Sequence, residues 1–414
     1  MRRLFGRDRP SPAATGAAAS GVLSGRPGFE YLADDEVYLD SACQTLRPQP
    51  VIDALTDYYT THNACGDRVK YAWGRRVDEQ VDATRDAVLA ALDLPSRRYA
   101  ASFTLNTTYG INLLLNQLPG GRYRRVVTTH TEHNSVFLST MAYARRAGVE
   151  RILLDRTPDG ALVFSDADLA DAVVVVSAMN NVDGAVTQGL PDLVARTRAA
   201  GGIVVVDAAQ AFGHAPAVLR GLDADAVCFS AHKAYGASLG VVAASKALLM
   251  GLEVSFIGGG QVTGVTAHDY ELYEEPHSRL EPGLQAWGEI IALGAALEWS
   301  GLTARRPDGA RQEREGELAA FLFDGLSALP NLRVLSKRGS ALVTVLPERV
   351  DGHRLATFLS KAGIMVRSGH FCAHHWLIEQ QKLPPLVRFS LGAHNTAADV
   401  EKAVATMAPL MKGL

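Results

Sequence analysis

The feature that most constrains the fold of this chain is a repeated alternation of short apolar runs and helical patterns between residues 101 and 244. Runs such as Val173-Val174-Val175-Val176 contain no alternating polar residues, which is typical of strands covered on both faces. Repeated strand–helix units of this kind favour a mostly parallel sheet with helices on either side. The predicted strands span residues 101–105, 125–129, 151–154, 173–177, 203–206, 226–229 and 241–244. The sequence therefore predicts an α/β fold around a mostly parallel seven-stranded sheet.

The pattern changes after Ser300, where a charged helical segment covers residues 305–326. A last helix is expected to begin at Thr396, with Asp399 placed three residues on as in a capping box. The strands expected in this part span residues 333–335, 341–346, 364–367 and 386–391, with a helix at 352–362. These shorter, mixed elements predict a separate and smaller α+β domain.

The sequence divides into three parts on this basis. We expect a large domain over residues 46–298 and a small domain formed by residues 31–45 together with 299–414. Residues 1–30 are rich in Ala, Gly, Pro, Ser and Arg and show no periodicity, so we expect a disordered tail. The pair Arg2-Arg3 is a weak match to a twin-arginine export signal, but charges and prolines follow where an apolar segment should stand.

Composition excludes several classes of function. The chain is 47% hydrophobic and 21% charged with a net charge of −3, so we expect neither nucleic acid nor a membrane surface as a partner. No stretch approaches the roughly 20 apolar residues that cross a bilayer. The four cysteines are widely spread without metal-site or disulfide spacing, which predicts a reducing compartment and hence a cytoplasmic location.

Polar residues follow the predicted strands at the points where these strands end. In open α/β sheets, ligands bind beyond the carboxyl ends of the strands, so these residues are expected to share one site. They are Asn106, Thr107 and Thr108; Glu132, His133 and Asn134; Asn180 and Asn181; Asp207 and Gln210; and Ser230, His232 and Lys233. Taken singly, each has a structural alternative, such as a threonine or aspartate that caps a helix, or a lysine that reaches solvent.

Together these residue types match the chemistry of pyridoxal 5′-phosphate (PLP). A lysine at the buried end of a strand, such as Lys233, is pushed toward the neutral amine that forms a Schiff base. Hydroxyls and free N–H groups at a helix N-terminus, as after Asn106, suit a phosphate. Asp207 can keep a pyridine nitrogen protonated, and a histidine ring can lie on the pyridine.

Longer stretches resemble a known family. VVVDAAQAFGHAPA followed by DADAVCFSAHKAYG resembles the signature of class V aminotransferase-like PLP enzymes of fold type I. The resemblance runs from about Val37 to the C-terminus and is greatest for the cysteine desulfurase and selenocysteine lyase branch. Within that branch, RSGHFCA is similar to the cysteine motif of the short-loop, group II desulfurases.

The resemblance implies a role for each strand-end residue. Lys233 is expected to bind the cofactor covalently, and Asp207 is expected to pair with its ring nitrogen. Gln210 is expected to bond the ring oxygen, while His133 stacks on the ring and assists proton transfer. The remaining implied contacts are Thr107, Thr108, Ser230 and His232 for the phosphate, and Asn181 and Arg388 for the substrate carboxylate, with Asn181 also among the cofactor-binding residues.

Cys372 allows three interpretations. Free cysteines are usually small buried hydrophobes. A thiol in a glycine-containing segment between His370 and His374 is instead expected to be exposed, partly ionised and nucleophilic. The same histidines with His375 and Cys372 could ligate a metal, although no second cluster completes such a site, so we expect none. The resemblance favours the nucleophile, with Cys372 forming a persulfide.

The sequence predicts a PLP-dependent cysteine desulfurase that releases alanine from L-cysteine or a related amino acid. We also expect a homodimer, in which Trp287 replaces a threonine that in relatives reaches the partner's phosphate, and a sulfur-acceptor protein as a possible partner. Because Trp287 departs from the family pattern, selenocysteine lyase, thioether C–S lyase and epimerase activities stay open. A non-catalytic or metal-binding α/β protein is the alternative of a different class.

Overall fold

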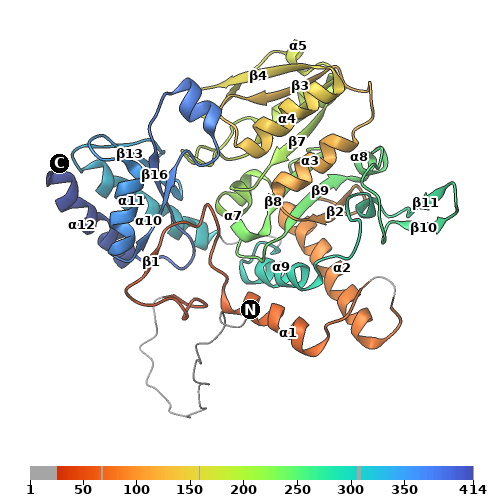
Figure 1. Ribbon diagram of the computed structural model, residues 1–414, viewed down its shortest axis with the longest axis horizontal. Helices are drawn as coiled ribbons and strands as arrows, with labels where there is room; N and C mark the ends of the chain where they lie inside the picture. Colours follow the sequence, from red (N-terminus) through yellow and green to blue (C-terminus); the bar gives the residue numbers. More distant parts are fainter. Residues whose placement is uncertain (1–25, 67–68, 158, 305–308, 414) are drawn as a thin grey trace, which may run out of the picture.

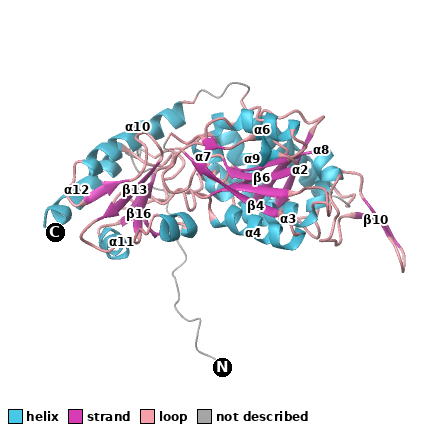
Figure 2. Ribbon diagram, turned by 90° about the horizontal axis from the view of Figure 1, so that it is seen from above, coloured by secondary structure: helices cyan, strands magenta, loops and turns pink. Residues whose placement is uncertain are grey.

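The structure is a computed structural model of the chain and describes residues 26–66, 69–157, 159–304 and 309–413. It contains a large sheet covered by helices on both faces and, beside it, a smaller unit around a four-stranded sheet (Figures 1 and 2). None of the helices in the described ranges is long and apolar enough to cross a membrane.

The large sheet contains all seven predicted strands and one more. In sheet order the strands are β2 (Tyr99–Thr104), β9 (Gly240–Ser245), β8 (Ala226–Ser230), β7 (Ile203–Asp207), β6 (Ala172–Ser177), β3 (Arg125–Thr129), β4 (Glu150–Arg156) and β5 (Leu162–Val163). Neighbours pair in parallel from β8 through β4, whereas β9 is antiparallel to β2 and β8. The mostly parallel α/β fold is thus confirmed, but the count of seven is wrong. The two-residue edge strand β5, antiparallel to β4, is too short to give a sequence pattern.

Helices cover both faces of this sheet, which explains the continuous apolar strands. Val174 packs in the hydrophobic core on one face and Val173 and Val175 in the core on the other, and all three are fully buried. One face is covered by α2 (Ala72–Leu92), α6 (Leu190–Ala199), α7 (Ala211–His214) and α9 (Trp287–Trp299), and the other by α3 (Thr107–Gln117), α4 (Asn134–Ala147) and α8 (Lys246–Met250). Helix α1 (Gln49–Thr61) packs on α9, and the short α5 (Asp166–Leu169) lies near α6.

The smaller unit follows the predicted order of elements. Its strands and helices are β12 (Leu332–Val334), β13 (Leu342–Pro347), β16 (Leu386–Ser390) and β15 (Arg367–Gly369), with α10 (Ala310–Ser327), α11 (Gly352–Lys361) and α12 (Ala397–Gly413). Of the predicted helix 305–326, residues 305–308 lie outside the described residues. The single strand predicted at 364–367 is two strands, because β14 (Ile364–Met365) pairs with β1 (Val37–Tyr38) while β15 pairs with β16. The β1–β14 pair attaches the N-terminal segment to this unit.

The predicted disordered tail, residues 1–30, includes residues that are packed in the structure. Residues 1–25 lie outside the described residues, but the segment that follows is packed. Arg26 forms a buried ion pair of 2.6 Å with Asp399 of α12, and Phe29 is 1% exposed against the ring of Trp299. The expectation is wrong for residues 26–30 because two side chains in this segment find distant partners that local composition does not reveal.

A hairpin of β10 (Val262–Val265) and β11 (Tyr270–Leu272) projects from the large unit, on the side away from the smaller one (Figure 2). The carboxyl ends of the central strands lie on the opposite side, toward the smaller unit. There Arg388 of β16 donates to the carbonyl of Asn181, which follows β6, at 2.7 Å. The two units therefore meet where the sequence predicts the site.

Candidate active site

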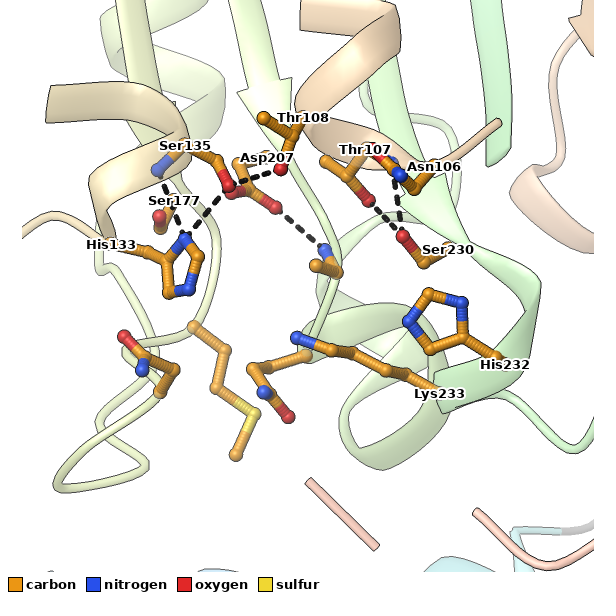
Figure 3. A pocket seen from close by; sticks show the side chains of 14 residues that line it. Asn106, Thr107, Thr108, His133, Ser135, Ser177, Asp207, Ser230, His232 and Lys233 are labelled. Carbon is orange, nitrogen blue, oxygen red and sulfur yellow. Dashed lines mark hydrogen bonds between the residues drawn. The ribbon is translucent and has the colours of Figure 1, made fainter. Parts of the chain in front are cut away.

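A cavity of about 250 Å³ lies at the carboxyl ends of β2, β3, β6, β7 and β8 (Figure 3). It is lined by all nine residues predicted to bind a cofactor: Thr107, Thr108, His133, Asn181, Asp207, Gln210, Ser230, His232 and Lys233. Cys372 and Arg388 do not line it, but both lie close by. The topology thus gathers side chains that are up to 126 residues apart in the sequence.

Lys233 extends into this cavity from the turn after β8, toward His133 on the far side (Figure 3). The side chain is partly buried, and its amine has no hydrogen-bond partner among the described residues. Burial lowers the pKa of Lys233, and although the charge of Asp207 opposes this effect, Arg388 adds to it. The site therefore makes the neutral amine, which is the nucleophilic form, easier to reach than in an exposed lysine.

Asp207 ends β7 and is 5% exposed. Its Oδ1 accepts a hydrogen bond from the backbone N–H of Ala209 at 2.8 Å, so it closes a turn and does not cap α7. Burial raises the pKa of Asp207, opposed by that N–H and by the charge of Lys233. Because so few groups stabilise this buried carboxylate, a cation bound in the cavity would stabilise it further.

Gln210 also lines the cavity, and only one end of its side-chain amide has a hydrogen-bond partner. Its Nε2 donates to the carbonyl of Ala42 at 2.8 Å, while its buried Oε1 has no partner. The expected contact between Gln210 and a cofactor ring oxygen stays a prediction. The orphaned oxygen nevertheless marks this side of the cavity as incomplete without a further polar group.

The N-terminus of α3 opens into the cavity. Asn106 caps it by accepting from the N–H of Tyr109 at 2.9 Å, so the alternative that a threonine is the cap is wrong. Thr107 is instead bound to Ser230, through its N–H at 2.9 Å and its hydroxyl at 2.6 Å. The N–H of Thr108 has no partner among the described residues, which leaves a helix N-terminus of the kind that binds anions.

His232 flanks this N-terminus as a neutral ring. Burial lowers its pKa to about 4, and the charges of Lys233 and Arg47 add to that effect. A neutral imidazole can donate one hydrogen bond to a phosphate oxygen, and a bound dianion would favour its protonated form.

His133 caps α4 on the other side of the cavity. Its Nδ1 accepts from the N–H of Ser135 at 3.0 Å, so the neutral ring carries its proton on Nε2. The Ser135 hydroxyl lies 2.9 Å from the same nitrogen and 2.5 Å from the hydroxyl of Thr108, which links the ring to the end of α3. Burial lowers the pKa of His133 to about 3, with the charge of Lys233 as the next cause.

Cys372 is exposed, on a loop of the smaller unit that reaches across to the large unit. Phe371 and Cys372 have φ angles of +49° and +57°, which non-glycine residues seldom adopt. Two bonds from the large unit hold this strained loop. The N–H of Asn134 donates to the Cys372 carbonyl at 2.6 Å, and the amide of Asn181 donates to the Phe371 carbonyl at 2.7 Å. These bonds hold the backbone that carries the thiol beside the His133 cap, at the edge of the cavity.

Arg388 is buried beneath this loop and partly engaged. Besides its bond to the Asn181 carbonyl, it lies 3.6 Å from Asp40 and 4.9 Å above the ring of Phe371. Its Nε is buried and has no partner. The expected contact with a substrate carboxylate stays a prediction, for which this nitrogen is available.

The histidines around Cys372 have separate partners. His374 bonds Asn134 at 2.9 Å, and His375 bonds His130 at 3.0 Å and stacks on the ring of Phe137. Within the described ranges, no three His, Cys, Asp or Glu side chains form a group that could hold a metal ion.

Comparison with known proteins decides the family. The family model described as Aminotransferase class-V matches residues 37–403. The chain belongs to this family. A Vibrio cholerae protein named as a probable cysteine desulfurase is 29% identical over 380 residues, covering 90% of this chain and 92% of that protein.

Two solved structures of cysteine desulfurases confirm the fold type I architecture expected for a class V enzyme. The apo structure from Thermococcus onnurineus has a TM-score of 0.83 at 27% identity and covers 92% of this chain and 96% of its own. The Escherichia coli CsdA structure, described as an S-sulfonic acid form, has a TM-score of 0.80 at 27% identity and covers 94% and 98%.

The main departure from the class V pattern, Trp287, lies away from the Lys233 cavity. It begins α9 and lines a second cavity of about 620 Å³ together with Gly259 and Gly260. Its indole nitrogen is buried and has no partner. The proximity of Trp287 to a partner subunit's phosphate stays a prediction.

Five further residues line the Lys233 cavity: Asn106, which was expected at the shared site without a binding role, and Ser135, Ser177, Met179 and Ala209, which were not expected there. Ser135 follows the expected Asn134 and donates its N–H to the His133 cap of α4, so a helix-start signal could have identified it. Met179 and Ala209 carry no chemical signal in the sequence, because their place in the wall follows from the turn geometry alone.

Proposed function

We propose that this protein is a PLP-dependent cysteine desulfurase, which transfers the sulfur of L-cysteine or a related amino acid to Cys372 and releases alanine. One observation carries the proposal: the strained Cys372 loop is bonded to the segment next to His133, at the cavity that holds Lys233 and Asp207. A cofactor lysine, a buried carboxylate and an exposed thiol are thus brought to one place from both units.

The cavity fits PLP in three respects. The buried Asp207 would be stabilised by the cation that a protonated pyridine nitrogen provides, and burial lowers the pKa of Lys233 toward its nucleophilic, neutral form. The α3 N-terminus, with the Thr108 N–H and the hydroxyls of Thr107 and Ser230, suits a phosphate. His133 provides a flat neutral ring on the opposite wall. Bound there, PLP would supply an electron sink for the reaction.

The residues of the chain then have distinct tasks. Arg388 Nε and Asn181 hold the substrate carboxylate, and Lys233 Nζ moves the proton of the substrate α-carbon. The Cys372 thiolate attacks the substrate sulfur, so that a sulfur–sulfur bond forms as the carbon–sulfur bond breaks. The electron pair of the broken bond stays with carbon, which takes a proton and becomes the methyl group of alanine. The transferred sulfur stays on Cys372 as the outer atom of a persulfide.

The assembly and location are part of the same proposal. Exposed apolar side chains beside the projecting hairpin (Phe256, Val265 and Leu284 at 53%, 70% and 76% exposure) support a homodimer through this side. The exposed Cys372 is accessible to a sulfur-acceptor protein. Four free cysteines fit the reducing cytoplasm. The two units would act as domains with the boundaries expected from the sequence.

The test is a substrate panel on PLP-loaded protein, with alanine, pyruvate and sulfide measured as products. We expect equimolar alanine and sulfide from L-cysteine in the presence of a reducing thiol. Cys372→Ala should abolish this turnover while keeping bound PLP, and the exposed Cys65→Ala should behave like the wild type. Pyruvate as the main product, or turnover restricted to a selenium substrate or a thioether, would replace the desulfurase assignment with another lyase activity. Turnover by Cys372→Ala near the wild-type rate would remove the role of this thiol.

A further inference from the structure

The segment that carries Lys233 also contains a residue in a strained backbone conformation, Tyr235. Its φ angle is +67°, in the left-handed region that non-glycine residues rarely adopt, and it is 1% exposed. Such a conformation persists only where the surrounding structure holds it in place. The contacts of Tyr235 therefore bear directly on the position of Lys233, two residues earlier in the chain.

Most of these contacts come from outside the large sheet. The N–H of Tyr235 donates to the hydroxyl of Thr45 at 2.7 Å. Its own hydroxyl donates to Oε1 of Glu315 at 2.9 Å and accepts from the N–H of Ala393 at 2.9 Å. The guanidinium of Arg311 lies 4.9 Å above the tyrosine ring. Two residues of α10 thus contact Tyr235: Arg311 lies over its ring and Glu315 bonds its hydroxyl.

Glu315 also reaches a second segment of the cavity wall. It is 3% exposed and is bonded to Arg311 at 3.1 Å, and its other oxygen lies 3.7 Å from Nδ1 of His214. Burial opposes its charge, but Arg311 and His214 outweigh burial and lower the pKa of Glu315. His214 ends α7, the helix that follows Asp207 and Gln210.

Helix α7 is packed directly on the lysine turn. A Cβ atom on Gly213 would lie 2.4 Å from the carbonyl oxygen of Lys233, so these two backbones touch. A single carboxylate of the smaller unit, that of Glu315, is therefore hydrogen-bonded to Tyr235 in the segment after Lys233 and lies 3.7 Å, without a hydrogen bond, from His214 in the segment after Asp207.

We propose that Glu315 is a positioning residue on helix α10, which sets Lys233 relative to Asp207 by its hydrogen bond to Tyr235 and by its packing beside His214. The inference rests on the proposed function, because it assumes that Lys233 and Asp207 hold the cofactor. The position of the cofactor-binding lysine would then depend on how the smaller unit packs against the large one.

The decisive variant is Tyr235→Phe, which removes one hydroxyl and keeps the ring. In protein without PLP, amide hydrogen exchange of the peptide covering residues 231–240 should become at least about tenfold faster, because the lost hydroxyl bonds both Glu315 and the N–H of Ala393. In loaded protein, the dissociation constant of PLP should rise by about tenfold. The pH midpoint of the visible absorbance band should also shift, because Lys233 is no longer held in a fixed position relative to Asp207.

Tyr99→Phe is the matched control. Tyr99 is also 1% exposed, and its hydroxyl donates to the carboxylate of Asp223 at 2.6 Å, beside the amino end of β8. It therefore loses the same type of bond far from the cavity. Glu315→Gln serves as the conservative variant, since its amide oxygen can still accept from Tyr235, and it should keep slow exchange at 231–240.

The outcomes separate the two proposals. If Tyr235→Phe lowers the denaturation midpoint as Tyr99→Phe does, but leaves exchange at 231–240 and the absorbance titration unchanged, Glu315 is merely structural and the inference is wrong. If the wild type binds no PLP, the proposed function fails, yet the exchange comparison in protein without PLP still decides whether Glu315 and Tyr235 hold the lysine turn.

Discussion

The neutral state of His133 predicts a specific loss of stability in mild acid. Its pKa is lowered from the ordinary 6.5 to about 3, first by burial and then by Lys233. A histidine whose pKa is lower in the folded state stabilises the fold fully above pH 6.5, and this contribution falls as the pH drops from 6.5 toward the folded value. At pH 5, about 1.5 pH units below 6.5 at about 1.4 kcal/mol per unit, the loss is about 2 kcal/mol.

His232 acts in the same direction, since its pKa is lowered to about 4. Two buried carboxyls act in the opposite direction: burial raises the pKa of Asp207 and of Glu132, so the fold gains stability as these two groups take protons. The total pH dependence therefore mixes both effects. Only a comparison of variants with the wild type isolates the contribution of His133.

The assay is urea unfolding of PLP-free protein at pH 8 and pH 5, for the wild type, His133→Gln and the exposed His268→Gln as control. Glutamine does not titrate, so between pH 8 and pH 5 the free energy of unfolding of His133→Gln should fall by about 2 kcal/mol less than that of the wild type. His268→Gln should follow the wild type. Equal losses in His133→Gln and the wild type would refute the argument that the fold holds His133 neutral.

Three further predictions concern the cavity and the assembly. Asp207→Asn should raise the unfolding midpoint of PLP-free protein, because it removes a buried charge, while it weakens PLP binding by more than about tenfold; a lower midpoint with unchanged affinity would contradict this. Gly213→Ala should destabilise the fold by about 1–3 kcal/mol and weaken PLP binding, because its new methyl group meets the Lys233 carbonyl, whereas Gly316→Ala, whose nearest neighbour is 3.6 Å away, should be tolerated. Sedimentation of the loaded protein at micromolar concentration should show a dimer, and the charge that Leu284→Glu introduces on the exposed apolar surface should dissociate it; a monomer with full PLP occupancy would contradict the proposed assembly.

The sequence indicated the large sheet and the residues at its edge because both signals are local. An uninterrupted run such as Val173–Val176 is explained only by burial on both faces, and the parallel pairing of β6 with β7 then places Ser177 beside Asp207. Once the strands are parallel and adjacent, their ends must converge. Nine residues predicted on that basis line one cavity for this reason.

What the sequence did not indicate depends on contacts between distant segments. Phe29 packs against the ring of Trp299, and the left-handed Tyr235 is hydrogen-bonded to Glu315, 80 residues further on. The Ser135 hydroxyl joins Thr108 to His133 only because α3 and α4 begin side by side. Neither propensity nor periodicity reports such pairs, which appear only when the chain is folded.

The most direct test of the central claim is the mass of the Cys372 peptide after PLP-loaded protein is exposed to L-cysteine and the thiols are then blocked. The account predicts that this peptide gains the mass of one sulfur atom, that peptides with Cys43, Cys65 and Cys228 do not, and that one alanine is released per persulfide formed. Alanine or sulfide release without sulfur on Cys372, or sulfur found equally on the exposed Cys65, would contradict the desulfurase mechanism.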